Sequence, residues 1–237
     1  MSLKFPVSLV GKRGAADLPT FGNASRDFVA ASSQDIVVAD SSSLPTGAQT
    51  WCCWFKTDLF TTVYNLLGKN VDGGNASGRI RINGNGGNKN LQAYFSEDGS
   101  SLVSVSSAAN SILVNTWYHV AVTFTPSGFL KLYINGVQNG STATTMTSIY
   151  NGTAPFCIGS LDNTQQYLDG HIADARIYDA DIGVTEIANL AAGTDYQTNL
   201  VGWWLTDTDD AVTDFAGTFA DATNNGSTYS TDGPLDP

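Results

Sequence analysis

Hydrophobic and polar side chains alternate between Trp117 and Phe124, which predicts a β-strand. One face of this strand holds Tyr118, Val120, Val122 and Phe124. Residues 125–128 predict a turn, residues 130–134 a second strand, and Asn135-Gly136 a two-residue hairpin into a third strand. The segment 116–140 therefore predicts a three-stranded meander.

Other apolar or alternating runs, bounded by turn-forming residues, predict strands along the rest of the chain. These runs are residues 35–39, 49–57, 64–69, 78–83, 91–97, 102–106, 155–159, 170–179 and 200–206. One short helix is predicted over 183–193, with Gly183 as its N-cap and Gly193 at its end. About a dozen short strands at this spacing favour an all-β fold of two packed sheets.

Composition agrees with a single loop-rich domain of 237 residues, because charged residues make up only 14% of the chain and glycine occurs 24 times. The net charge of −11 excludes nucleic acid and anionic membrane surfaces as favourable partners. The chain has 20 Asp but only 2 Glu. Asp is common in turns and in loops that bind cations, so divalent cations are expected partners.

Neither a disulfide framework nor a zinc site is predicted from Cys52, Cys53 and Cys157, because their number is odd and their spacing is not that of metal ligands. At least one free thiol is expected. No run is apolar and long enough to span a bilayer, and the N-terminal residues have no signal-peptide pattern. The sequence does not determine the oligomeric state.

Four segments together resemble the laminin-G-like, concanavalin A-like jelly rolls, in the branch related to pentraxins. Residues 26–57 resemble the opening strand pair of that family, which ends with a Trp two residues before a Lys. WYHVAVTF (117–124) and LKLYINGV (130–137) resemble its central meander. FCIGS (156–160) and the segment 167–190, with its Ile-x-Asp-x-Arg-Ile-Tyr run, resemble its closing strands and short helix.

The resemblance implies a two-sheet antiparallel jelly-roll sandwich over residues 21–206, preceded by an N-terminal strand or extension at 1–20. Residues 207–237 are expected to form a loop-rich tail that packs on the same domain. In many relatives a segment like 200–227 stands at the beginning of the domain. Here it either closes the sandwich or begins another unit; closure is favoured because exposed Trp203 and Trp204 would be costly.

Catalysis is not predicted. His119 lies in the middle of a strand, where a buried, hydrogen-bonded structural role is the expectation, and His171 is interpreted in the same way. A retaining glycosidase needs two carboxyl groups roughly 5 Å apart. Glu97 and Glu186 are far apart in the sequence, and Glu186 belongs to the predicted helix. A glycoside hydrolase is therefore only the third interpretation.

Binding is the favoured class, and the resemblance implies loops that hold a glycan or a surface protein, with one calcium ion as the candidate cofactor. The best candidate ligands for calcium are Asp72, Asp162 and Asn163. The alternative is that these residues only form Asx turns. Tyr64, Tyr150 and Tyr167 are candidate stacking platforms for a sugar, since they lie at strand ends or in loops.

The predicted function is non-catalytic carbohydrate recognition. The alternative is a structural or adhesion protein of a virion, fibre or surface layer that uses the sandwich for protein contacts. Both functions imply an extracellular location, or one on a virion or cell surface.

Overall fold

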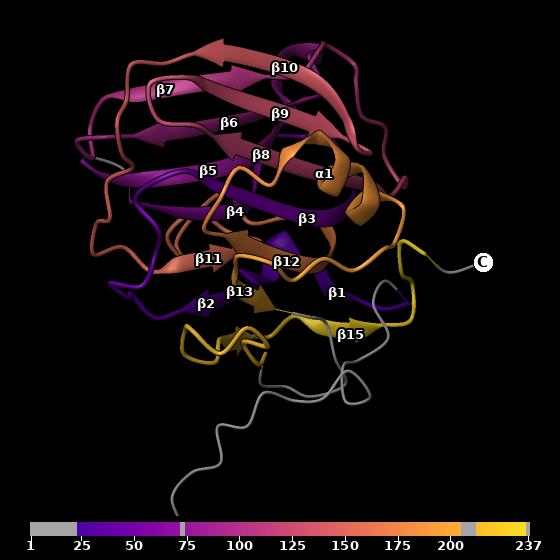
Figure 1. Ribbon diagram of the computed structural model, residues 1–237. Coiled ribbons are helices and arrows are strands. Elements are labelled where there is room, and N and C mark those ends of the chain that lie inside the picture. Colours follow the sequence, from indigo (N-terminus) through magenta and orange to yellow (C-terminus); the bar gives the residue numbers. More distant parts are fainter. Residues whose placement is uncertain (1–22, 72–73, 205–211, 236–237) are drawn as a thin grey trace, which may run out of the picture.

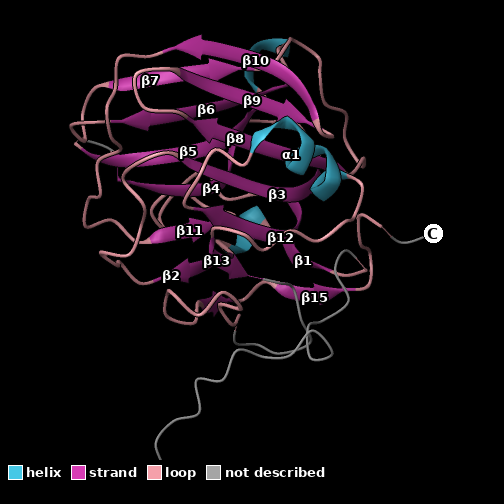
Figure 2. Ribbon diagram, in the orientation of Figure 1, coloured by secondary structure: helices cyan, strands magenta, loops and turns pink. Residues whose placement is uncertain are grey.

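Two antiparallel β-sheets pack face to face in the computed structural model, which describes residues 23–71, 74–204 and 212–235 (Figures 1 and 2). Strands account for 47% of the structure and helices for 7%. The predicted all-β jelly-roll sandwich is confirmed. None of the helices in these ranges has the length and apolar character needed to cross a membrane.

The first sheet carries the predicted meander at one end. In spatial order its strands are β10 (Val137–Ala143), β9 (Phe129–Ile134), β8 (Tyr118–Phe124), β3 (Gln49–Thr57), β12 (Gly170–Tyr178), β1 (Ser25–Phe28) and β15 (Thr228–Ser230). β13 (Leu200–Trp204) also pairs with β12. Asn135 and Gly136 have φ angles of 49° and 79° between β9 and β10, which confirms the predicted hairpin.

The second sheet lies behind the first and contains most of the remaining predicted strands (Figure 1). In spatial order these are β14 (Thr223–Asn225), β2 (Asp35–Val38), β11 (Phe156–Ile158), β4 (Val63–Val71), β5 (Asn75–Asn83), β6 (Asn90–Ser96) and β7 (Leu102–Ser106). Two 3-10 turns, η1 (Ala30–Ser32) and η2 (Asn85–Gly87), lie in the connections.

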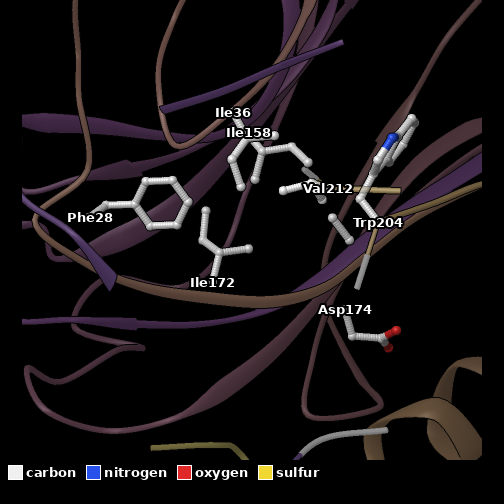
Figure 3. A pocket seen from close by; sticks show the side chains of 8 residues that line it. Phe28, Ile36, Ile158, Ile172, Asp174, Trp204 and Val212 are labelled. Carbon is white, nitrogen blue, oxygen red and sulfur yellow. The ribbon is translucent and has the colours of Figure 1, made fainter. Parts of the chain in front are cut away.

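Alternation decides which side chains enter the core between the sheets. Val120, Val122 and Phe124 of β8 are fully buried there, as their period of two predicts. Figure 3 shows another part of this core, a cavity of only about 10 Å³ lined by residues that include Phe28 and Ile172. This space is too small to hold a ligand.

A β-bulge in β12 separates the core from a buried polar cluster on the outer face of the first sheet. The pairing of β12 with β3 shifts between Ala173 and Arg176, and Asp174 has a φ of 55°. The Asp174 carboxylate points away from the apolar residues in Figure 3. It accepts hydrogen bonds from Arg176 Nε (2.8 Å) and Trp203 Nε1 (2.6 Å).

The helix α1 (Gly183–Ala191) covers part of the same outer face, where Ile187 and Leu190 are buried. Its N-cap is Ile182, one residue before the predicted Gly183, and the Asp181 carboxylate accepts a hydrogen bond from the Gly183 amide (3.1 Å). Gly193 has a φ of 80° and ends the helix as predicted.

The C-terminal segment contains two short strands where the sequence predicted only loop. β14 pairs with β2, and β15 pairs with β1, so each adds an edge strand to one sheet. Strands of three residues are too short to show an alternating pattern of apolar and polar residues in the sequence. They are defined by their pairing with the edge strand of a sheet. Trp203 and Trp204 of β13 are each 2% exposed. The expected extension at 1–20 lies outside the described residues.

Candidate functional site

Three connections meet at one end of the sandwich: residues 29–34 between β1 and β2, 58–62 between β3 and β4, and 159–169 between β11 and β12. A backbone hydrogen bond from the Asp58 amide to the Asp169 carbonyl (3.0 Å) holds the second and third connections together. The connections thereby form the rim of a pocket.

The pocket has a volume of about 430 Å³ and opens to solvent. Most of its lining side chains carry hydrogen-bonding groups. The lining residues are Ala30, Thr61, Thr62, Val63, Tyr64, Gln165, Gln166, Tyr167 and Asp169. Hydroxyl, amide and carboxylate groups beside two aromatic rings form a lining that suits a polar ligand with an apolar face.

Two of the three tyrosines predicted as ligand contacts line this pocket. Tyr64 is only 2% exposed and belongs to the core, and its hydroxyl is 2.6 Å from Thr61 Oγ1. Tyr167 is partly exposed, and its hydroxyl donates a hydrogen bond to the Asn163 carbonyl (2.8 Å). Tyr167 therefore offers a ring to a ligand, whereas Tyr64 forms the wall behind it.

Tyr150, the third predicted tyrosine, is not among the residues that line the pocket. Its amide donates a hydrogen bond to the Ser96 carbonyl (2.8 Å), next to the turn between β6 and β7. Its ring lies where a side chain at Gly99 or Gly152 would stand, at 2.9 Å and 2.6 Å from an added Cβ. Tyr150 therefore packs against backbone that only glycine accommodates.

The predicted calcium ligands Asp162 and Asn163 lie in a tight turn beside the pocket, with φ angles of 51° and 57°. Asp162 accepts a hydrogen bond from the Thr164 hydroxyl. The Asn163 side-chain amide faces the Asp35 carboxylate and, when it is oriented with its nitrogen toward Asp35, donates to the two carboxylate oxygens (3.0 Å and 3.2 Å). The Asp162 contact lies within the turn, as in the Asx alternative, whereas the Asn163 contact connects the turn to β2. Asp72 lies outside the described residues, so calcium binding stays a prediction.

Asp35 is the internal anchor of this turn. It is fully buried and accepts hydrogen bonds from Ser160 Oγ (2.5 Å) and Asn225 Nδ2 (2.8 Å). Burial raises the pKa of Asp35, although these hydrogen bonds act in the opposite direction. The contacts join the turn to β2 and to the C-terminal strand β14.

His119 is buried, as predicted, with 1% of its surface exposed and its ring packed edge-on against Trp54 at 5.3 Å between centroids. The expected side-chain hydrogen bond is not found, since neither ring nitrogen has a partner among the described residues. Burial and, to a smaller extent, the nearby Arg176 charge together lower the pKa of His119 to about 3. His119 is therefore a neutral, structural residue at neutral pH.

His171 differs from His119 because it lies partly exposed near the pocket rim. Its Nδ1 is 3.1 Å from Ser25 Oγ. Burial lowers the pKa of His171, as does the Lys56 ammonium, while three nearby aspartates raise it. A neutral imidazole is favoured.

Gln165, Gln166 and Asp169 are pocket residues that sequence reasoning did not select. All three follow the candidate calcium ligands Asp162 and Asn163 in the same connection, so position in the chain was the available signal. Gln166 Oε1 is buried and has no hydrogen-bond partner among the described residues. Such an atom is costly unless a donor from outside satisfies it.

Comparison with known proteins agrees with the fold. The Laminin_G_3 family, described as the concanavalin A-like lectin/glucanases superfamily, matches residues 31–188. No curated protein matches the chain. A Bacteroides ovatus protein provisionally assigned to carbohydrate binding has a TM-score of 0.69 and 20% identity, with coverage of 90% of this chain and 60% of that protein.

Two further solved structures are similar at lower scores. A heptameric SAP-like pentraxin from Limulus polyphemus has a TM-score of 0.50 and 15% identity, covering 67% of this chain and 81% of that one. The ligand-binding domain of botulinum neurotoxin serotype D was solved in complex with N-acetylneuraminic acid. It has a TM-score of 0.52 and 18% identity, and the match covers 67% of this chain and 39% of that one. At these identities the structures show a common fold.

The family match spans more than half of the 237 residues, and its expected sandwich is the one observed. The chain belongs to the concanavalin A-like lectin/glucanase superfamily.

Proposed function

We propose that this domain binds carbohydrate, without chemical change, in the pocket lined by Tyr167 and Asp169. The observation that carries the proposal is the partly exposed ring of Tyr167 beside the side chains of Gln165 and Asp169 in a space of about 430 Å³. Ligand pockets usually measure about 300–1,000 Å³. Sugars present both apolar C–H faces and hydroxyl groups, which match a ring and its polar neighbours.

Relatives of similar fold support the carbohydrate class. One is provisionally assigned to carbohydrate binding, and another was solved with N-acetylneuraminic acid. Because their identity to this chain is 20% or less, they support the class of ligand and not the sugar. A location where the domain meets extracellular or surface glycans follows from the proposal.

The two glutamates do not support hydrolysis. Glu97 accepts hydrogen bonds from the Thr147 amide (2.9 Å) and hydroxyl (2.5 Å), and these lower the pKa of Glu97. A general acid needs a raised pKa. Glu186 lies in the first turn of α1 and accepts a hydrogen bond from Asn189 (3.2 Å). Each glutamate thus has a local structural contact in a different part of the fold.

A glycan array tests the proposal, with calcium and with chelator as separate arms. We expect Asp169→Asn to lower the affinity for the best glycan by at least about tenfold, since a hydrogen bond to a charged group contributes about 1.5–3 kcal/mol. Tyr167→Ala should also lower it, because the variant loses the ring that packs on the sugar. Tyr150→Ala is the matched control, because it removes a partly exposed tyrosine away from the pocket.

Equal loss in the Tyr150 and Tyr167 variants would contradict this location of the site. No glycan bound in either arm would contradict carbohydrate binding itself. In that case a regular oligomer in light scattering would favour the structural or adhesion alternative. Binding only in the calcium arm would support the predicted ion.

A further inference from the structure

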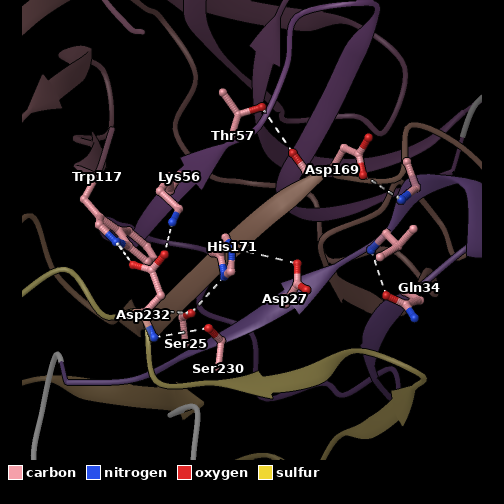
Figure 4. A network of polar contacts seen from close by, with 12 residues as sticks. Ser25, Asp27, Gln34, Lys56, Thr57, Trp117, Asp169, His171, Ser230 and Asp232 are labelled. Atoms are coloured by element: carbon pink, nitrogen blue, oxygen red, sulfur yellow. Dashed lines mark hydrogen bonds and ion pairs between the residues drawn. The ribbon is translucent and has the colours of Figure 1, made fainter. Parts of the chain in front are cut away.

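A row of polar side chains crosses three strands on the outer face of the first sheet, close to the pocket but separate from its lining (Figure 4). Lys56 of β3 pairs with His171 of β12, and His171 pairs with Asp27 of β1. Directly opposite residues on neighbouring strands have Cβ atoms about 4.5–5.5 Å apart. Phe55 and Ile172 are core residues, so these adjacent positions face away from the core.

Asp58 joins the row because it follows β3 and is two residues after Lys56. One carboxylate oxygen from each of Asp27 and Asp58 and one ring nitrogen of His171 all lie within 4.8 Å of one another. The distance from His171 Nε2 to Asp27 Oδ1 is 3.9 Å. Three metal-ligand side chains from separate parts of the sequence therefore meet at one place.

A hydrogen-bond chain fixes which nitrogen of His171 faces the carboxylates. Ser25 Oγ donates its single proton to the Asp232 carbonyl (2.7 Å). It can therefore only accept from His171 Nδ1, at 3.1 Å, so Nδ1 carries the proton in the neutral ring. Nε2 then has a free lone pair directed toward Asp27. Metal-binding histidines are held in this way, with the second nitrogen donating to a neighbour.

The charges around the cluster of Asp27, Asp58 and His171 favour the binding of a cation. Lys56, the nearest positive charge in the row, forms an ion pair with Asp232, which also accepts a hydrogen bond from Trp117 Nε1 (2.8 Å). Among the residues that the structure describes, neither Asp27 nor Asp58 forms an ion pair with a lysine or arginine. Two carboxylates that no lysine or arginine among the described residues neutralises match the charge of a divalent ion.

We propose that Asp27, Asp58 and His171 form a binding site for a divalent transition-metal ion of the Zn²⁺ class. Imidazole suits Zn²⁺ and its neighbours in the first row, whereas Ca²⁺ prefers oxygen ligands alone. In a tetrahedral Zn²⁺ site the ligand atoms are about 3.4 Å apart, given bonds of about 2.0–2.2 Å. Asp58 is exposed, so its side chain can move the remaining distance, and water completes the coordination.

This site goes beyond the proposed carbohydrate pocket and does not depend on it. It joins β1, β12 and the connection after β3 by one ion. The same connection contributes to the pocket, because the Asp58 amide donates to the Asp169 carbonyl (3.0 Å). Ion binding is therefore expected to order one wall of the pocket.

Calorimetric titration with ZnCl₂ tests the site, using tag-free protein that has been treated with chelator and dialysed. We expect one site with a Kd in the micromolar range or below, and weaker binding of CaCl₂. His171→Gln and Asp58→Asn should each weaken Zn²⁺ binding by at least tenfold. Ser25→Ala should weaken it by about 10–100-fold, the usual effect of losing a neighbour that orients a ligand. Asp162→Asn is the matched control and should bind as the parent protein does.

Nuclear magnetic resonance of the imidazole nitrogens gives a second test in the unmodified protein, which has only two histidines. We expect the Nδ1–H form of His171 without metal, and a shift of its Nε2 signal on addition of Zn²⁺. The buried His119 should not respond. An Nε2–H form, no Zn²⁺ binding, or Zn²⁺ binding that His171→Gln leaves unchanged would each overturn the proposal.

Discussion

Removal of the Asp174 side chain should destabilise the domain more than the loss of any exposed aspartate. Asp174 is 1% exposed and accepts hydrogen bonds from the buried groups Arg176 Nε and Trp203 Nε1. Burial raises the pKa of Asp174, so the ion pair with Arg176 mainly offsets desolvation. Removing one partner nevertheless leaves the other buried and incompletely paired.

The cost of Asp174→Ala can be worked from these contacts. Two buried donors lose their acceptor, at about 1–3 kcal/mol each. Alanine at a φ of 55° adds about 1 kcal/mol. The expected loss is about 5 kcal/mol for Asp174→Ala. Asp174→Asn keeps an acceptor oxygen and tolerates this backbone conformation, so about half that loss is expected.

Urea denaturation followed by tryptophan fluorescence measures the free energy of unfolding, with chelator present. Asp162→Ala is the matched control, because Asp162 has a similar φ of 51° but lies at the surface. It should lose only about 1–2 kcal/mol, from the backbone conformation and from the exposed hydrogen bond with Thr164. If Asp174→Ala cost no more than Asp162→Ala, the buried pairing of Asp174 would not contribute as described. If Asp174→Ala does not fold, the free energies of unfolding of Asp174→Asn and Asp162→Asn are compared instead.

Three other predictions concern groups in the core and at its edge. The pKa of His119 falls to about 3 on folding, so the unfolded chain binds the extra proton and stability is lost as pH falls below about 6.5. His119→Phe should remove about 2 kcal/mol of the pH dependence between pH 7 and pH 5, measured by urea denaturation at each pH. Gly170→Ala should cost at least about 3 kcal/mol or prevent folding, because φ is 142° and the added Cβ would lie 2.2 Å from the Lys56 carbonyl oxygen; the melting temperature reports the loss. All three cysteines are buried, so Ellman's reagent should label none in the native protein and three in urea.

The long strands could be predicted from sequence because alternation and turn residues coincide in them. The segments 49–57 and 102–106 match β3 and β7 residue for residue. The bulge at Asp174 could not be predicted, since an aspartate and an arginine in an apolar run give no sign that they bury each other's charge. The tail strands were missed because their partners are distant edges.

The candidate site was predictable in part. Tyr64 and Tyr167 were selected separately as aromatic residues at strand ends or in loops, and the structure brings them to one pocket. The local pattern cannot show that the Tyr64 ring belongs to the core. Nor can it show that Asp27 pairs with His171, since that register belongs to strands far apart in sequence. Sequence reasoning therefore misses sites whose residues come together only through the pairing of strands that are far apart in the chain.

The position of the pocket follows from how the chain passes between the sheets. β3 belongs to one sheet and β4 to the other, and β11 and β12 are divided in the same way. The connections 58–62 and 159–169 must therefore cross the same open end of the sandwich. The Asp58 amide joins them by donating to the Asp169 carbonyl (3.0 Å), and the Asn65 amide of β4 donates to the Gln166 carbonyl (2.9 Å). Because backbone atoms hold the pocket open, Gln165 and Tyr167 can be adapted to a ligand while the core that sets their positions stays unchanged.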